Sequence, residues 1–175
     1  TNPIVMAGMA GFKALQTGFE REKVQVAFDV LLRGDTKASE ALREEIRQYG
    51  MVTPYMTAEL QDAAKMMLSF GIARDRIMPN IKALGDIAMG DRNKLNSLTL
   101  AFSQMTASGR LMGQDLLQMI NAGFNPLSEI SRKTGKSIGV LKEEMEKGKI
   151  SAEMVTQAFY SATQAGGQFH GMTEK

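Results

Sequence analysis

Glycines and prolines divide this chain into short segments, and this punctuation constrains the fold more than any other feature. The 175 residues include 17 glycines and 4 prolines. Between these breaks, apolar residues recur at three- and four-residue spacing, which is typical of amphipathic helices. The longest regular example runs from Asp91 to Ser108 and carries Leu95, Leu98, Phe102 and Met105. Since short connections favour antiparallel neighbours, the pattern predicts a mainly α fold, a compact irregular bundle of about eight short helices.

Start and stop signals place most of these helices. Asn125-Pro126 begins one of them, because an asparagine side chain caps exposed backbone N–H groups and proline fits the first helical position. Gly135 ends that helix, since glycine readily takes the left-handed conformation that closes a helix. The same logic predicts helices that begin near Asp35, Thr57, Asp91, Gly113, Ser137 and Ser151 and that end near Tyr49, Gly71, Gly109, Gly123, Gly148 and Gly166-Gly167. We expect a break at Pro79 and a loose segment over the last eight residues.

The first 32 residues give two different predictions. Residues 4–20 read as a helix with small residues on one side. Residues 23–32 instead alternate apolar and other side chains, which favours one or two short strands half buried in a sheet. The apolar positions of that run are Val24, Val26, Phe28, Val30 and Leu32.

Length predicts a single helical domain over residues 1–175, with a division into 1–90 and 91–175 as the alternative. The chain begins at a threonine rather than a methionine, so we expect it to be a fragment of a longer polypeptide. It contains no run of 18 or more apolar residues, so we predict no membrane span.

Charge and cysteine content exclude several classes of function. The 21 basic and 19 acidic side chains leave a net charge of +2, which argues against a dedicated nucleic-acid binder. Without cysteine, the chain has no disulfide, zinc thiolate or thiol catalyst. The one histidine, His170, lies between glycines and has no evident partner, so we predict an exposed residue. Ser103, Ser108 and Ser128 read as helix-edge or capping serines, because no histidine stands near them.

Three carboxylates merit separate attention because a pair could perform acid–base chemistry or hold a metal. Asp86 lies within LGDIA, Asp91 precedes the longest helix and Asp115 follows Gly113 near a helix start. A carboxylate near a helix start is stabilised by the helix dipole. We therefore predict capping and surface roles for all three, and no catalytic, cofactor-binding or metal-binding residue in the chain.

Basic residues and methionines could serve contacts with other molecules. The basic group comprises Arg132, Lys133, Lys136, Lys142, Lys147 and Lys149, which alternate with acids and predict a solvated helix face rather than a nucleic-acid site. The 14 methionines are an unusual number for this length, and their flexible thioethers adapt to different partners. We expect most of them in the core, with Met6, Met9 and Met51 available to partners.

An ordered set of short motifs also carries a family resemblance. The order TP-Y, EL, A-K-LSFG, LGDIA-G, SGRLMGQDLLQ, NAGFNPL and EEMEKGKIS resembles the N-terminal region of tail tape measure proteins of long-tailed phages and prophages. The resemblance covers roughly Phe19 to Lys175 and is clearest over 53–90 and 107–167. No single motif in it is chemically diagnostic.

The resemblance implies a non-enzymatic module that serves tail assembly and tail length determination through helix-mediated contacts. It implies self-association and binding to tube, tip or assembly-chaperone proteins, with no small-molecule substrate, no cofactor and no specific nucleic-acid site. It also implies assembly in the host cytoplasm followed by residence in the virion tail. Two alternatives stay open, a generic helical adaptor and, less favoured by the residues, a cell-wall hydrolase module.

Overall fold

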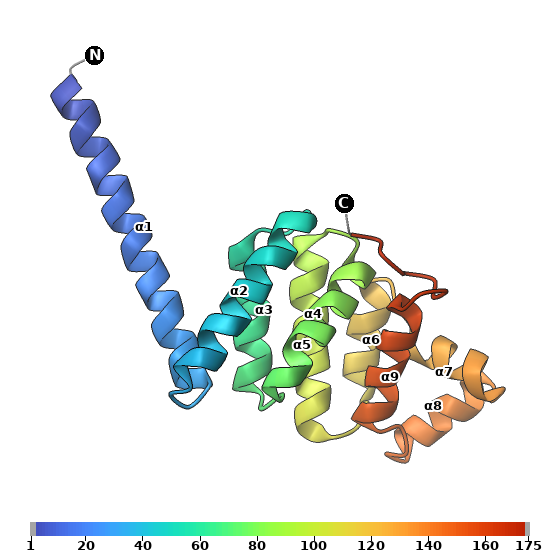
Figure 1. Cartoon of the computed structure of the whole chain (residues 1–175). Coiled ribbons are helices and arrows are strands. Elements are labelled where there is room, and N and C mark those ends of the chain that lie inside the picture. Colours follow the sequence, from blue (N-terminus) through green and yellow to red (C-terminus); the bar gives the residue numbers. More distant parts are fainter. Residues whose placement is uncertain (1–2, 174–175) are drawn as a thin grey trace.

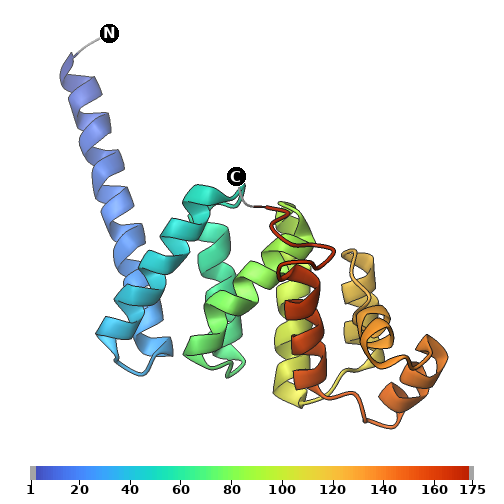
Figure 2. The same ribbon diagram turned by 45° about the vertical axis from the view of Figure 1, so that its right-hand side comes forward.

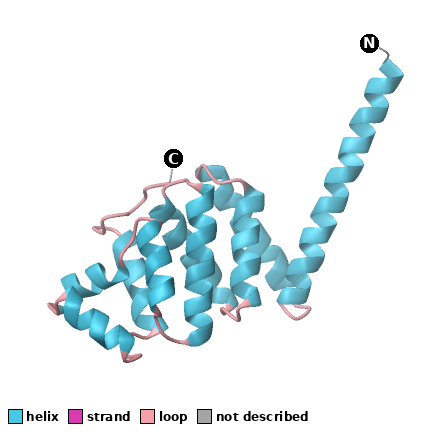
Figure 3. Ribbon diagram, turned by 180° about the vertical axis from the view of Figure 1, so that it is seen from behind, coloured by secondary structure: helices cyan, strands magenta, loops and turns pink. Residues whose placement is uncertain are grey.

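The computed structural model describes the backbone of residues 3–173 and the side chains from Leu15 onward. One long helix, α1 (Pro3–Leu31), extends away from a body formed by the helices that follow (Figure 1). The mainly α prediction is confirmed, since the described part holds helices and loops with only an isolated bridge between Arg110 and Ser151 (Figure 3). The body comprises α2 (Thr36–Val52), α3 (Thr57–Ser69), α4 (Arg74–Ala88), α5 (Arg92–Ser108), α6 (Gly113–Asn121), α7 (Pro126–Thr134), α8 (Ile138–Glu146) and α9 (Ala152–Thr163).

Side-chain caps set most helix starts as the sequence predicts. Asp91 accepts hydrogen bonds from the backbone N–H groups of Asn93 (2.9 Å) and Lys94 (3.1 Å) before α5. Asn125 accepts one from Leu127 before α7, where Pro126 occupies the first turn. Asp35, Ser137 and Ser151 cap α2, α8 and α9 in the same way. Each cap satisfies backbone donors that have no partner inside the helix.

A continuous hydrophobic core joins the helices of the body. Its centre is Phe159 of α9, which is fully buried and meets the rings of Phe102 (5.3 Å between centroids) and Phe124 (4.7 Å) edge to face. Edge-to-face pairs add to the stability that burial of the rings supplies. Buried residues of the same cluster extend from Phe28 in α1 to Phe169 beyond α9.

The strand prediction for residues 23–32 is wrong, because most of this run forms the last turns of α1. Phe28 is fully buried, and Val24 and Leu32 pack against the core beside it. These three residues recur at four-residue spacing, so a helix places them together against α2 and α3. A lone strand would leave its backbone groups without partners, whereas a helix pairs them internally. The four-residue spacing therefore outweighs the alternation.

The predicted break at Pro79 is also wrong, since α4 runs through it without interruption. Pro79 lies in the second turn, where its missing N–H removes one backbone bond to Asp75. Ile77, Ile81 and Leu84 on the same helix are fully buried against neighbouring helices. Their burial offsets the lost bond.

The C-terminal segment beyond α9 packs back onto the body, so the prediction of a loose tail is wrong for the described residues. Phe169 is buried, and its ring meets that of Phe124 at 5.9 Å. Its backbone N–H donates to the carbonyl oxygen of Ala162 (2.8 Å). Thr173 is buried and bonds Asp86 near the end of α4. This segment closes the end of the bundle.

Candidate interaction surfaces

The three candidate carboxylates all serve the structure. Asp86 is buried in α4 and accepts two hydrogen bonds from Thr173, one from the hydroxyl (2.8 Å) and one from the backbone N–H (3.3 Å). Asp91 caps α5. Asp115 lies in the first turn of α6 and is buried rather than on the surface, and this burial raises the pKa of its carboxyl while a bond from the Met112 backbone opposes the rise.

The serine and histidine candidates show no catalytic arrangement. Ser103 is fully buried in the middle of α5, not at a helix edge, and its Oγ has no hydrogen-bond partner among the described residues. Ser108 donates to carbonyl oxygens at the end of α5, and Ser128 is exposed in the first turn of α7. His170 is exposed as predicted, with Nδ1 3.0 Å from the carbonyl oxygen of Thr163. The printed sequence holds one histidine, His170, and no hydrogen bond of the described residues joins it to any of these serines.

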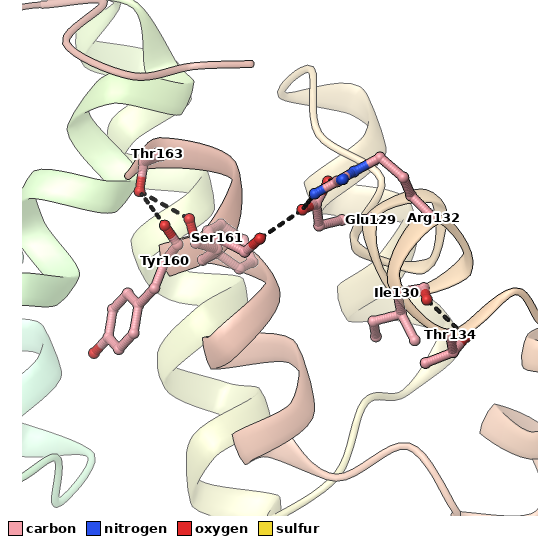
Figure 4. A network of polar contacts seen from close by, with 8 residues as sticks. Glu129, Ile130, Arg132, Thr134, Tyr160, Ser161 and Thr163 are labelled. Carbon is pink, nitrogen blue, oxygen red and sulfur yellow. Dashed lines mark hydrogen bonds and ion pairs between the residues drawn. The ribbon is translucent and has the colours of Figure 1, made fainter. Parts of the chain in front are cut away.

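Two of the six basic residues of the predicted group, Arg132 in α7 and Lys136 just after it, form ion pairs at the surface. Figure 4 shows Glu129 between Arg132 on its own helix (2.6 Å) and Ser161 on α9 (2.7 Å). The bond from Arg132 is the main cause that lowers the pKa of Glu129. Lys136 pairs with Glu144 of α8 (2.8 Å). The Glu129–Ser161 bond joins α7 to α9, whereas the pairs of Arg132 and Lys136 are local surface contacts that fit the predicted solvated face.

Among the described side chains, which run from Leu15 to Thr173, no group of three or more acidic or histidine side chains is arranged to hold a metal ion. None of the helices over the same range is both long enough and apolar enough to cross a bilayer.

The largest exposed apolar side chains of the extended helix lie on one face of α1. Leu15, Phe19, Val26 and Val30 keep 54–71% of their surface in water. We call these four residues the α1 stripe. The residues of α1 that pack on the body, Val24 and Phe28, lie on the opposite side of the helix, because a residue advances by about 100° along an α-helix. Figure 2 shows the same helix leaving the body from another direction.

A second exposed apolar surface lies where α2 ends, α3 begins and α4 ends. The Tyr55 hydroxyl joins these segments, since it donates to the carbonyl oxygen of Gly85 (2.6 Å) and accepts from the N–H of Gly90 (2.9 Å). Burial raises the pKa of Tyr55 well above its ordinary value, so the hydroxyl keeps its proton. The exposed side chains around it form what we call the methionine corner: Met51, Val52, Met56 and Met89.

Met51 is exposed, as the sequence predicts. Met6 and Met9 lie outside the described side chains. The core holds Met67, Met105 and Met119 in full burial. Among the described residues, other exposed methionines lie outside the corner, namely Met112, Met154 and Met172.

Comparison with known protein families adds the decisive observation. A model described as "Tape measure protein" matches residues 13–175, nearly the whole chain. The chain belongs to the tape measure protein family. Comparison with curated proteins and with solved structures gives no match. The resemblance read from the sequence is confirmed, and the family gives this chain a structural role in the phage tail.

In this tape measure protein, sequence reasoning missed part of the α1 stripe. The strand prediction for residues 23–32 separates Val26 and Val30 from Leu15 and Phe19, which belong to the predicted 4–20 helix. The signal was present as intervals of four, seven and four residues between the four side chains, which place them on one helical face. The stripe thus extends beyond the predicted 4–20 helix.

Proposed function

We propose that this chain is a non-enzymatic structural module through which a tape measure protein associates with itself and with other tail proteins during assembly. By holding the tape measure protein in the growing tail, it contributes to tail assembly and to the determination of tail length. The module forms in the host cytoplasm and then resides in the virion tail. The expected partners are the tube protein, the tip complex and assembly chaperones.

The observation that supports this proposal most strongly is the pair of exposed apolar surfaces on a member of a tail family. Soluble monomers rarely expose contiguous apolar patches larger than a few hundred Å² without a binding role. Here the α1 stripe and the methionine corner lie on different helices, so one copy can engage two partners. Methionine side chains suit the second surface, because they adapt to partners of different shape.

The polar side chains support a non-enzymatic role. Asp86 is bound to Thr173, and Asp91 caps a helix. Glu129 is held between Arg132 and Ser161. A catalytic acid or base must instead be placed to reach a substrate. We propose that this chain has no catalytic, cofactor-binding or metal-binding residue. We also propose that it forms a single helical domain built on one continuous core.

The methionine corner can be tested by binding to purified tube, tip and chaperone proteins from the same phage or prophage. We expect the chain to bind at least one of them and the double variant Met51→Glu/Met56→Glu to lose that binding. The double variant Gln104→Glu/Gln114→Glu is the matched control, since it adds the same charge at exposed positions of α5 and α6. If Met51→Glu/Met56→Glu binds these proteins as strongly as wild type does, the methionine corner is not a binding surface for them. A wild-type chain that binds none of these proteins and does not self-associate would refute the proposed function.

A further inference from the structure

A groove between α2 and α4 opens at the surface beside the methionine corner. It is a hollow of about 250 Å³ that is lined by Glu45, Gln48, Tyr49, Val52, Met78 and Lys82. Tyr49 and Met78 are buried and form its floor, whereas Glu45, Gln48 and Lys82 are exposed at its edges. Val52 belongs both to the groove and to the methionine corner, so the two surfaces are continuous.

The two helices that form the groove run in the same direction. A Cβ on Gly85 would lie 2.6 Å from the Tyr49 hydroxyl, and a Cβ on Gly90 would meet the side chain of Pro54 at 3.4 Å. The contact thus advances by the same number of residues on both segments, towards the methionine corner. The groove therefore leads from the middle of α2 and α4 to the corner at their ends.

The surroundings of the groove favour a helix as its occupant. Within residues 3–173 the structure has helices, loops and one isolated bridge, so this surface offers no sheet edge to which an extended peptide could add a strand. Two neighbouring helices instead offer the depression between them to the side chains of a third helix. From Met78 to Met89 the chain rises by about 17 Å, which a helix of about three turns can cover.

The two edges of the groove carry opposite charges. Glu45 lies on the α2 edge and Lys82 on the α4 edge, and neither takes part in an ion pair or a side-chain hydrogen bond among the described residues. The neighbouring Glu44, in contrast, pairs with Arg47 (2.6 Å). A helix in the groove would be complementary if it carried a basic side chain over α2 and an acidic side chain over α4.

We propose that the groove and the methionine corner together bind one amphipathic helix of another tail protein. The apolar side chains of that helix contact Val52 and Met78 in the groove and the methionines at the corner. A basic side chain on one of its edges pairs with Glu45, and an acidic side chain on the other pairs with Lys82. The inference rests on the proposed function and deepens it, since it gives the methionine corner a partner of defined secondary structure and charge.

The charges of the groove favour a protein over a nucleic acid or a bilayer as the occupant. Nucleic-acid sites and helices that lie on a membrane surface both gather lysines and arginines. Here the charged side chains that line the groove are one acid and one base. Such a pair suits a partner that itself carries both signs.

Val52→Glu tests the groove, because it places a charge among apolar contacts. We expect it to weaken binding to the tube, tip or chaperone protein that wild type binds by at least about tenfold. Val140→Glu is the matched control, since Val140 on α8 is exposed to nearly the same degree (43% against 46%) and should leave binding unchanged. Equal binding by the two variants would overturn the inference. Binding of a tail protein by wild type would then still support the proposed function, so the two failures are distinguishable.

Glu45→Lys and Lys82→Glu test the charged edges. Each should weaken binding by about three- to tenfold, and the effect should shrink at high salt because exposed charge pairs are screened. Glu40→Lys and Lys142→Glu are the matched controls, since they make the same changes at exposed positions that do not line the groove. If the edge variants bind as their controls do, the charge pairing is wrong.

The kind of segment that binds can be identified by cross-linking, because the chain contains no cysteine of its own. Gln48→Cys labelled with a benzophenone maleimide places a photoreactive group at the edge of the groove. We expect it to cross-link one segment of the partner whose apolar residues recur at three- and four-residue spacing. A synthetic peptide of that segment should become helical, by circular dichroism, when the chain is added. Cross-linking to an extended or proline-rich segment, or a peptide that stays non-helical when bound, would overturn the inference.

Sedimentation equilibrium of the chain alone distinguishes a partner protein from a second copy. We expect Val52→Glu and Val140→Glu to associate to the same extent as wild type does. If Val52→Glu alone reduces self-association, a second copy occupies the groove and the proposed partner is wrong. A wild-type chain that binds no tail protein and does not self-associate would refute the proposed function together with this inference.

Discussion

Replacement of Thr173 by valine removes one hydroxyl from the contact that holds the C-terminal segment to α4. In the wild-type chain this hydroxyl donates to the buried carboxylate of Asp86 (2.8 Å). It also lies 3.4 Å from the hydroxyl of Tyr49, which must donate in this pair because Thr173 uses its proton on Asp86. Valine has nearly the same shape as threonine, so the change removes the polar contacts and leaves the packing.

The expected loss follows from the burial of the partners. A hydrogen bond to a charged group contributes about 1.5–3 kcal/mol, and a buried group that loses its partner keeps the cost of its desolvation. The backbone N–H of Thr173 still reaches Asp86 at 3.3 Å, so part of the stabilisation remains. We expect Thr173→Val to lower the free energy of unfolding by about 2 kcal/mol. In a domain of this size, this loss corresponds to a decrease in Tm of about 4–8 °C.

The C-terminal segment beyond α9 could separate from the body before the whole domain unfolds. In that case the free energy of unfolding lost by Thr173→Val cannot exceed the free energy with which the segment binds the body. Hydrogen exchange separates the two cases. The amide of Phe169, which donates to Ala162, should exchange faster in Thr173→Val than in wild type. Urea denaturation measures the global effect.

Thr173→Ser is the matched control, because serine keeps the hydroxyl and loses only a methyl group. We expect it to retain most of the stability and the slow exchange of Phe169. The reasoning would be refuted if Thr173→Val matched wild type within about 0.5 kcal/mol with unchanged exchange. Equal destabilisation by valine and serine would show instead that the methyl group, not the hydroxyl, stabilises the segment.

Two further substitutions test packing and charge. Gly85→Ala should destabilise by about 1–3 kcal/mol in urea denaturation although alanine favours helices, because its Cβ would lie 2.6 Å from the buried hydroxyl of Tyr49; a gain in stability would show that the tyrosine moves aside at no cost. Glu129→Gln should lower stability by about 1 kcal/mol at pH 7, since it removes the ion pair with Arg132. Because the folded-state pKa of Glu129 is lowered, its contribution is present above the unfolded pKa of about 4.3 and is lost as the pH falls through the folded value. Stability profiles of the two proteins should therefore converge below about pH 4, and a constant difference down to pH 2 would contradict this assignment.

The candidate surfaces were only partly predictable from the sequence. Exposure of Met51 was predicted from the number of methionines, and residues 4–20 were predicted to be a helix with small residues on one side. The methionine corner as a surface was not predictable, because the bonds of Tyr55 to Gly85 and Gly90, which join the start of α3 to the end of α4, connect residues about 30 positions apart.

Helix ends were determined by the sequence itself. The cap at Asp91, the Asn125-Pro126 start and the glycine stops at Gly109 and Gly135 act through bonds between residues a few positions apart. Such contacts form in the same way whatever surrounds them, so a local pattern suffices to predict them.

Tertiary structure decided the features that depend on burial. It kept residues 23–31 helical by burying Phe28, carried α4 through Pro79 and docked Thr173 onto Asp86, 87 positions earlier in the chain. In each case a weak local preference competes with the larger free energy of packing against a distant segment. The sequence alone does not show which distant segment will be there, and so the local preference was the wrong guide at these three places.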